Sequence, residues 1–322
     1  MISQRPIGSS DLRVSPVAMG CWPITGITSL GVTREQGLAT LQTAVDCGIN
    51  FFDTAFMYGY DGESEQMIAE AIGNRRDELV IASKCGLHWS AERTGLKDGR
   101  PQTLKQQCET SLGRLQTDWI DLYYLHAPDP NVPVAESAGM FVELKQAGKI
   151  RTVGVSNFNV EQLQQFHAVC PIDAVQPHYN MLQREIETDI LPWCQSHNAS
   201  ATVYWPLLKG LLAGKLARDH VFDKKDGRKK YPMFQGDEYQ RNCDFVDRLR
   251  QFADSIGKSV VDVVVNWTIQ QPGITSALCG AKRPDQISEV AKALDWSLST
   301  EQLATINQLI EDRGQPQTRG AV

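Results

Sequence analysis

The chain has 322 residues, of which 42% are hydrophobic and 22% are charged, and its formal net charge is −6. This composition is ordinary for a globular protein, and the net acidity argues against nucleic acid as a partner, because such binders are usually basic. No stretch reaches about 18 consecutive apolar residues and residues 1–6 open no apolar run, so we expect neither a membrane span nor an export signal. The eight cysteines show no two-residue spacing of a metal or redox motif, which favours a reducing cytoplasm.

Short β-like runs alternate with longer amphipathic segments along the chain. Residues 4–8 and 13–17 flank Ser9-Ser10-Asp11 and predict a small hairpin at the start. Strands alternating with helices indicate βαβ units and a parallel sheet. The strand-like runs that follow lie at residues 16–20, 49–52, 78–83, 119–125, 151–155, 173–176, 200–204 and 275–279.

Helices are predicted between these runs from spacing and caps. Thr33 precedes Gln36, and Ser299 precedes Gln302, at the separation of a capping box. Asn159 is a good cap for a helix that starts at residue 160. A further helix is indicated by apolar residues that share one face, namely Leu104, Cys108, Leu112 and Leu115.

Eight strands with intervening helices predict a closed (β/α)₈ TIM barrel that spans residues 1–322 as one domain. A doubly wound sheet is the alternative, but the glycine-rich turn of that fold does not follow the first strand. Residues 206–240 contain no clear strand, and a segment this long is usually functional or disordered. Residues 313–322 are rich in Gly, Pro and Gln, which predicts a flexible tail.

Four chemically distinct side chains follow neighbouring strands: Asp53, Tyr58, Lys84 and His126. Active sites of such barrels form at the C-terminal ends of the strands, so these groups can converge. Each residue alone has an ordinary explanation, since an Asp there often caps a helix and a Lys or His is usually solvated. Their joint placement after three successive strands favours a catalytic site.

The chemistry of such a cluster suits proton delivery to a developing alkoxide. A free tyrosine has a pKa near ~10, so Tyr58 needs a cation that stabilises its phenolate, and Lys84 can supply it. Asp53 can keep Lys84 charged, and His126 can orient a substrate oxygen. Hydride transfer to a carbonyl is a reaction of this type, and its hydride comes from a cofactor.

Three stretches resemble the aldo-keto reductase family: residues 50–59, 150–158 and 280–289. The similarity covers residues 4–311 and is closest to bacterial inositol-operon and general-stress types, through residues 204–207 and 210–215. It implies an N-terminal hairpin that plugs the barrel, and a monomeric enzyme that reduces an aldehyde or ketone with NADP(H). It also implies Tyr58 as general acid, tuned by Asp53 and Lys84, with His126 orienting the carbonyl.

Two sets of binding residues are predicted. Trp22 and Trp89 follow strands and could line the substrate pocket with Tyr58 and His126, although aromatic residues at a barrel rim often only shield it. No metal is implied. The cofactor would be bound by Gly20, Trp22, Asp53, Ser156, Asn157, Gln176, Tyr204, Trp205, Pro206, Leu207, Gly210, Lys215, Arg228, Gly280, Lys282, Arg283, Gln286 and Glu289.

Lys282 and Arg283 favour NADPH over NADH on independent grounds. Two adjacent cations at a helix N-terminus make an anion site that a 2′-phosphate would fit, and the alternative is a pair of solvated charges. Trp205 and Val290 depart from many relatives, which have a small polar residue and Asn there. Because the C-terminal tail is short, residues 206–240 are predicted to cover the cofactor, with Lys215 and Arg228 facing its phosphates.

Two other functions stay open from the sequence. A protein that binds NADPH as a redox sensor, with little turnover, would keep the same cofactor residues. A barrel lyase that uses Lys84 as a Schiff-base nucleophile is a further alternative. Asp53 beside Tyr58 argues against the lyase.

Overall fold

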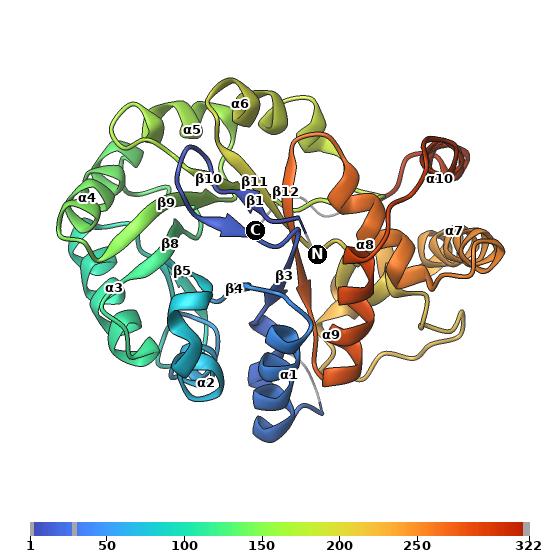
Figure 1. Cartoon of the computed structure of the whole chain (residues 1–322), viewed down its shortest axis with the longest axis horizontal. Coiled ribbons are helices and arrows are strands. Elements are labelled where there is room, and N and C mark those ends of the chain that lie inside the picture. The colour runs from blue at the N-terminus through green and yellow to red at the C-terminus, as the bar shows by residue number, and fades with distance from the viewer. Residues whose placement is uncertain (1–2, 28–30, 318–322) are drawn as a thin grey trace.

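Eight parallel strands close into a barrel in the computed structural model, which describes residues 3–27 and 31–317 (Figure 1). The order around the barrel is β10-β11-β12-β3-β4-β5-β8-β9. The barrel strands therefore follow one another in sequence order, and the strand numbers missing from this order belong to hairpins outside the barrel. The predicted TIM-barrel fold is therefore confirmed. Its strands are β3 (Val17–Gly20), β4 (Phe51–Asp53), β5 (Val80–Cys85), β8 (Ile120–Leu125), β9 (Ile150–Ser156), β10 (Ala174–Gln176), β11 (Ser200–Tyr204) and β12 (Ile274–Gly280).

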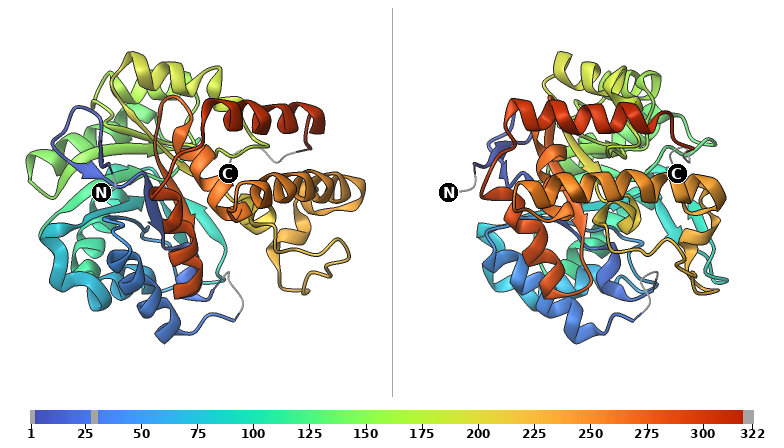
Figure 2. Two further views of the ribbon diagram at one scale, coloured as in Figure 1. Left: turned by 45° about the vertical axis from the view of Figure 1, so that its right-hand side comes forward. Right: turned by 90° about the vertical axis from the view of Figure 1, so that its right-hand side faces the viewer.

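Helices surround the barrel as an outer ring (Figure 1). The ring comprises α1 (Arg34–Asp46), α2 (Glu63–Ile72), α3 (Pro101–Leu115), α4 (Val134–Gln146), α5 (Val160–His167), α6 (Ile190–Ser196), α8 (Val260–Gln270) and α9 (Pro284–Ala291). Two further helices, α7 (Gly236–Ser255) and α10 (Thr300–Arg313), run side by side at the edge of the ring (Figure 2). Short 3₁₀ segments are η1 (Trp22–Thr25), η2 (Gly73–Glu78), η3 (Glu185–Glu187), η4 (Leu208–Ala213), η5 (Gly227–Lys230), η6 (Pro232–Phe234) and η7 (Lys292–Leu294).

The predicted caps form with both of their hydrogen bonds. The side chains of Thr33, Asn159 and Ser299 each accept a hydrogen bond from the backbone N–H three residues on. The side chain of the Gln at that position accepts in turn from the backbone N–H of the cap residue. Two of the otherwise unpaired donors at each helix start are satisfied in this way. Helices α1, α5 and α10 consequently begin where the sequence predicts.

Alternation along the strands creates two cores. Phe52 of β4 and Ile81 of β5 face the helices, whereas Phe51 and Val80 face the barrel interior. The interior cluster also contains Ile7, which is completely buried and belongs to the N-terminal hairpin of β1 (Arg5–Pro6) and β2 (Arg13–Val14). The hairpin therefore lies across one end of the barrel as predicted, although its paired strands are only two residues long.

Some segments differ from the sequence prediction. An unpredicted hairpin of β6 (Leu87–Trp89) and β7 (Gly95–Lys97) follows the third barrel strand. Residues 206–240 contain no strand, but α7 already begins at Gly236. In the predicted flexible tail, Arg313 forms a buried ion pair with Glu238, and the Gln317 N–H donates to the same carboxylate, while residues 318–322 lie outside the described part. No helix of residues 3–27 and 31–317 is long and apolar enough to cross a membrane.

Candidate active site

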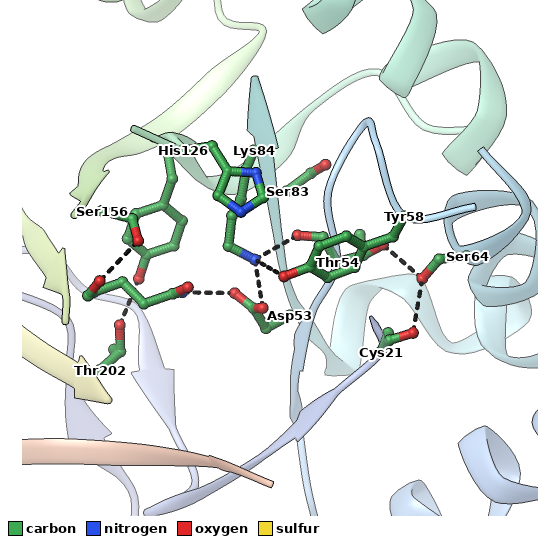
Figure 3. A network of polar contacts seen from close by, with 12 residues as sticks. Cys21, Asp53, Thr54, Tyr58, Ser64, Ser83, Lys84, His126, Ser156 and Thr202 are labelled. Carbon is green, nitrogen blue, oxygen red and sulfur yellow. Dashed lines mark hydrogen bonds and ion pairs between the residues drawn. The ribbon is translucent and has the colours of Figure 1, made fainter. Parts of the chain in front are cut away.

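Strand register brings the four predicted polar residues to one mouth of the barrel. Asp53 is the last residue of β4 and pairs with Ala82, while Lys84 of β5 pairs with Tyr124 of β8. His126 follows β8, and Tyr58 lies in the loop after β4. Figure 3 shows the Tyr58 hydroxyl and the Asp53 carboxylate directed at the Lys84 ammonium, with the His126 ring beside them.

The Lys84 ammonium is completely buried and has three acceptors. Its Nζ lies 2.5 Å from Asp53 Oδ1, 2.8 Å from the Thr54 carbonyl oxygen and 3.2 Å from Tyr58 Oη. A lysine ammonium has three N–H donors, so every one is used. The other Asp53 oxygen accepts from Gln176 Nε2 at 2.7 Å, which completes the carboxylate's surroundings.

Burial and pairing act in opposite directions on this ion pair. Burial raises the pKa of Asp53 and lowers the pKa of Lys84, whereas their attraction and hydrogen bond oppose both shifts. Burial and the Asp53 charge raise the pKa of Tyr58 well above its usual value. The phenol is therefore protonated. Burial and the Asp53 charge thus oppose the stabilisation of the phenolate that the sequence predicts from Lys84.

His126 is an uncharged group in this site. Burial, together with the nearby Lys84 ammonium, lowers the pKa of its imidazole well below the usual range. Its Nδ1 is buried and has no hydrogen-bond partner among the described residues. The ring lies edge-on to Tyr58, at 5.9 Å between centroids. A neutral imidazole can still donate one N–H to a substrate oxygen.

Aromatic residues predicted for the pocket gather around Tyr58. Trp22 meets the Tyr58 ring edge-on at 4.8 Å. Trp89 also lies close, but its indole Nε1 donates to the backbone carbonyls of Met57 and Gly59, at 2.8 and 2.9 Å. The indole N–H of Trp89 is thus hydrogen-bonded to the loop that carries Tyr58.

A second polar chain runs from β8 to β11. Asn157 Nδ2 donates to the His126 carbonyl at 2.9 Å, and Tyr204 Oη donates to Asn157 Oδ1 at 2.8 Å. Ser156 Oγ donates to the Gln176 carbonyl at 2.8 Å. The residues predicted to hold a nicotinamide are therefore brought together next to Asp53, Lys84 and His126. One difference is that the Gln176 amide is bonded to Asp53.

The segment after β11 folds back sharply. Trp205, Leu208 and Lys209 have φ of 62°, 43° and 54°, in the left-handed region that residues with a Cβ rarely adopt. Gly210, with φ of 92°, continues the turn without that penalty. Lys209 Nζ lies 4.4 Å from the Trp205 ring centroid, and Arg228 Nη1 donates to the Lys209 carbonyl at 3.4 Å. Strained backbone of this kind is typical of a functional segment.

The predicted phosphate-binding cations have different partners. Lys215 is paired with Glu289, Arg228 with Asp226 at 2.7 Å, and Arg283 with Asp285 at 3.0 Å. Arg283 is also half-exposed, and Asp285 already pairs with its guanidinium. The predicted binder Glu289 is likewise occupied by Lys215.

Lys282 is the exception among these cations. It is half-buried, and no carboxylate in the described part of the chain lies within ion-pair distance of its ammonium. Burial and the neighbouring Arg228 charge lower its pKa, and the Asp226 charge partly opposes them. Its backbone N–H donates to Gln286 Oε1 at 2.8 Å, and on the adjacent strands Gly280 pairs with Gly20. Lys282, a partly buried cation beside the Arg228 cation, is suited to bind an anionic group.

Several residues that shape this site were not predicted. Thr54 Oγ1 is 2.7 Å from Ser64 Oγ, and Ser64 reaches the Cys21 carbonyl (Figure 3). Glu65 and Arg114 form an ion pair beneath the Tyr58 loop. Thr54, Ser64 and Glu65 lie within a few residues of Tyr58 in the sequence, but nothing in their spacing indicates their partners.

Comparison with known proteins decides the family. The family model described as "Aldo/keto reductase family" matches residues 16–311. This chain belongs to the aldo/keto reductase family. The resemblance stated from sequence is therefore confirmed, and the chain is an oxidoreductase that reduces carbonyl compounds and works with a nicotinamide cofactor.

Individual aldo/keto reductases are similar over almost the whole chain. Aldo-keto reductase YhdN of Bacillus subtilis is 37% identical over 309 residues, covering 95% of this chain and 93% of the relative. The NADH-specific methylglyoxal reductase of Escherichia coli is 29% identical, covering 95% and 98%. Glycerol dehydrogenase AKR11B4 from Gluconobacter oxydans superposes with a TM-score of 0.91 at 36% identity, covering 99% of this chain and 98% of the other. AKR11C1 from Bacillus halodurans, in its holo form, has a TM-score of 0.79 at 26% identity, covering 100% and 98%.

Proposed function

We propose that this aldo/keto reductase reduces an aldehyde or ketone to an alcohol, with Tyr58 as the proton donor and NADPH as the cofactor. The contact that carries the proposal is the 3.2 Å hydrogen bond from Lys84 Nζ to Tyr58 Oη. The same ammonium forms a buried ion pair with Asp53. Hydride is supplied by the reduced nicotinamide when it is bound. The protein's part is to deliver a proton and to stabilise the charge that develops on oxygen.

Each member of the cluster has a role that its geometry supports. Tyr58 is protonated, as an acid must be before the reaction. Lys84 already donates to the phenol oxygen, so it stabilises the phenolate left after proton transfer. Asp53 keeps Lys84 charged and fixes its position. The neutral imidazole of His126 donates to the substrate oxygen and orients the carbonyl next to Tyr58.

The donors around this cluster fit a dinucleotide. Ser156, Asn157 and Tyr204 would hold and cover the nicotinamide end, next to the catalytic group. Lys282, assisted by Arg228, would bind a phosphate on the adenosine end. Since Lys282 lacks a carboxylate partner among the described residues, we propose that NADPH is preferred over NADH.

The same contacts argue against a Schiff-base reaction at Lys84. A nucleophilic amine needs a free lone pair, and therefore an unprotonated nitrogen. Three acceptors surround Lys84 Nζ, one of them a carboxylate at 2.5 Å, which favours the ammonium. A redox sensor with little turnover is the remaining alternative, and it is separated from the reductase by turnover itself.

The experiment compares Tyr58→Phe with Tyr60→Phe. Both variants lose a phenol hydroxyl from one loop, but only Tyr58 contacts Lys84. Loss of a positioned general acid costs about 10²–10⁴-fold in rate, so we expect kcat to fall by that factor in Tyr58→Phe only. Turnover is followed by nicotinamide absorbance with a panel of aldehydes, and the Kd values for NADPH and NADH by tryptophan fluorescence. Cofactor binding without turnover in the unaltered protein would favour the sensor, and full activity of Tyr58→Phe would exclude the proposed mechanism.

A further inference from the structure

The loop that carries Tyr58, residues 54–62, contains neither helix nor strand, yet its backbone is held by donors from outside the loop. Four consecutive carbonyls, those of residues 56–59, accept hydrogen bonds. Arg114 Nη1 donates to Phe56 at 3.0 Å, and the Ser64 N–H donates to Tyr58 at 3.2 Å. Trp89 Nε1 donates to both Met57 and Gly59. The carbonyls of the two residues that flank Tyr58 in the chain are thus hydrogen-bonded to a single indole.

Arg114 connects this loop to the strand that carries Lys84. Its guanidinium lies 4.5 Å from the Phe56 ring centroid and 3.3 Å from Glu65 Oε2. Glu65 is completely buried, and its other oxygen accepts from Ser83 Oγ at 2.6 Å. Because Ser83 directly precedes Lys84, one network fixes both groups of the Lys84–Tyr58 contact.

Trp89 supplies an independent restraint from the unpredicted hairpin of β6 and β7. Its ring meets Tyr60 edge-on at 5.3 Å between centroids, and the Arg93 guanidinium lies over the Tyr60 ring at 4.2 Å. This stack places the indole N–H against the loop. An indole nitrogen has a single donor, so the bond to the two carbonyls leaves none for a substrate.

We propose that Trp89 and Arg114 are positioning residues of the reductase, which hold the Tyr58 hydroxyl in register with the Lys84 ammonium. The inference rests on the proposed role of Tyr58 as proton donor. Neither side chain contacts the Tyr58 hydroxyl or the Lys84 ammonium directly. Their effect comes through geometry, because a displacement of ~1 Å at a reacting group can cost about 10²-fold in rate.

The test is Trp89→Phe, which keeps an aromatic ring but removes the indole N–H. We expect kcat to fall by about tenfold or more, with the KM for the aldehyde and the Kd for NADPH within about twofold of the unaltered protein. The matched control is Trp119→Phe, which removes an indole bond to Asp121 at the opposite end of the barrel and leaves kcat unchanged. Hydrogen exchange of the peptide that covers residues 54–64 should accelerate in Trp89→Phe only.

A second variant keeps the proposal testable if Trp89→Phe does not fold. Arg114→Lys retains the charge beside Glu65 but loses the planar group that reaches Phe56, so it should lower kcat with an unchanged KM. If both residues act on one loop, the double variant should lose less than the product of the two single losses.

Three outcomes would overturn the inference. An unchanged kcat in both variants would do so, as would a rise confined to KM, which would make Trp89 a wall of the pocket only. An equal loss in Trp119→Phe would indicate a general loss of stability. Failure of the proposed function looks different, because the unaltered protein would then lack turnover or Tyr58→Phe would retain it, while the exchange rates would still report on the loop.

Discussion

The buried Asp53–Lys84 pair gives the sharpest test of how this site is held together. The two side chains are 3% and 0% exposed, and Lys84→Met would leave the carboxylate without its counter-ion. Removal of one partner from a buried pair costs about 3–5 kcal/mol, since the remaining charge is uncompensated. The Thr54 carbonyl would also lose its Lys84 donor. We therefore expect the free energy of unfolding to fall by about 3–5 kcal/mol near neutral pH.

The loss should depend on pH with a defined sign. Attraction to Lys84 lowers the Asp53 pKa, so its removal raises the folded-state pKa further above the unfolded value of about 3.9. A carboxyl with a raised folded pKa is favourable to stability below its unfolded pKa, and this contribution is lost as the pH rises through the folded value. The difference between the unaltered protein and Lys84→Met should accordingly shrink as the pH is lowered from about 8 toward about 5.

Urea denaturation followed by tryptophan fluorescence measures this difference at each pH. Lys145→Met is the matched control, because Lys145 pairs with Asp173 at 3.3 Å while 45% exposed, and such surface pairs contribute less than about 1 kcal/mol. The double variant Asp53→Asn/Lys84→Met should recover part of the loss, since no lone charge remains. A loss that grows toward acidic pH, or strictly additive single losses, would refute the reasoning.

Three further predictions concern the cofactor, the imidazole and a helix cap. Lys282→Ala should weaken NADPH binding by about tenfold or more with little effect on NADH, and Arg283→Ala should do less because Asp285 holds that guanidinium; equal losses for both nucleotides, measured by fluorescence titration, would contradict the 2′-phosphate assignment. Because the His126 pKa lies well below its usual range, the imidazole stays neutral above it, and kcat/KM for reduction should show no limb near 6.5; a His126-dependent limb there would disprove a neutral ring. Ser299→Ala should lower the free energy of unfolding by about 1 kcal/mol through the lost cap of α10, whereas Ser255→Ala, at the end of α7, should have no such effect; equal urea midpoints for the two variants would remove the cap from the account.

Much of the fold was predictable because it is encoded locally. The caps of α1, α5 and α10 depend on side chains three residues apart, so they can be identified without knowing any tertiary contact. The barrel strands are short apolar runs buried on both faces, and their spacing reflects one helix between successive strands. The hairpin of β6 and β7 was missed because residues 87–97 are short and mostly polar, and the contact of Trp89 with the Tyr58 loop is visible only in the tertiary structure.

The candidate site was predicted as a set of residues, but its energetics was not. Placement of Asp53, Lys84 and His126 at strand ends follows from the parallel topology. Their pKa shifts depend on complete burial and on which charges lie nearest, and neither quantity can be obtained from spacing. The same is true of Arg283 and Lys282, since only the structure shows that Arg283 has a carboxylate within ion-pair distance and that Lys282 has none among the described residues.

The sequence by itself determined the barrel, the order of its strands, the caps of three helices and the family to which the chain belongs, because each depends on local patterns and motifs. Only the tertiary structure decided that Lys84 is bonded to three acceptors, that Trp89 directs its indole at the backbone around Tyr58, and that Arg114 and Glu65 join that loop to β5. These contacts join residues that are distant in the chain, and burial in a closed barrel sets their strength. The physical reason is that hydrogen bonds and charges depend on distance and solvent exposure, which one-dimensional order does not specify.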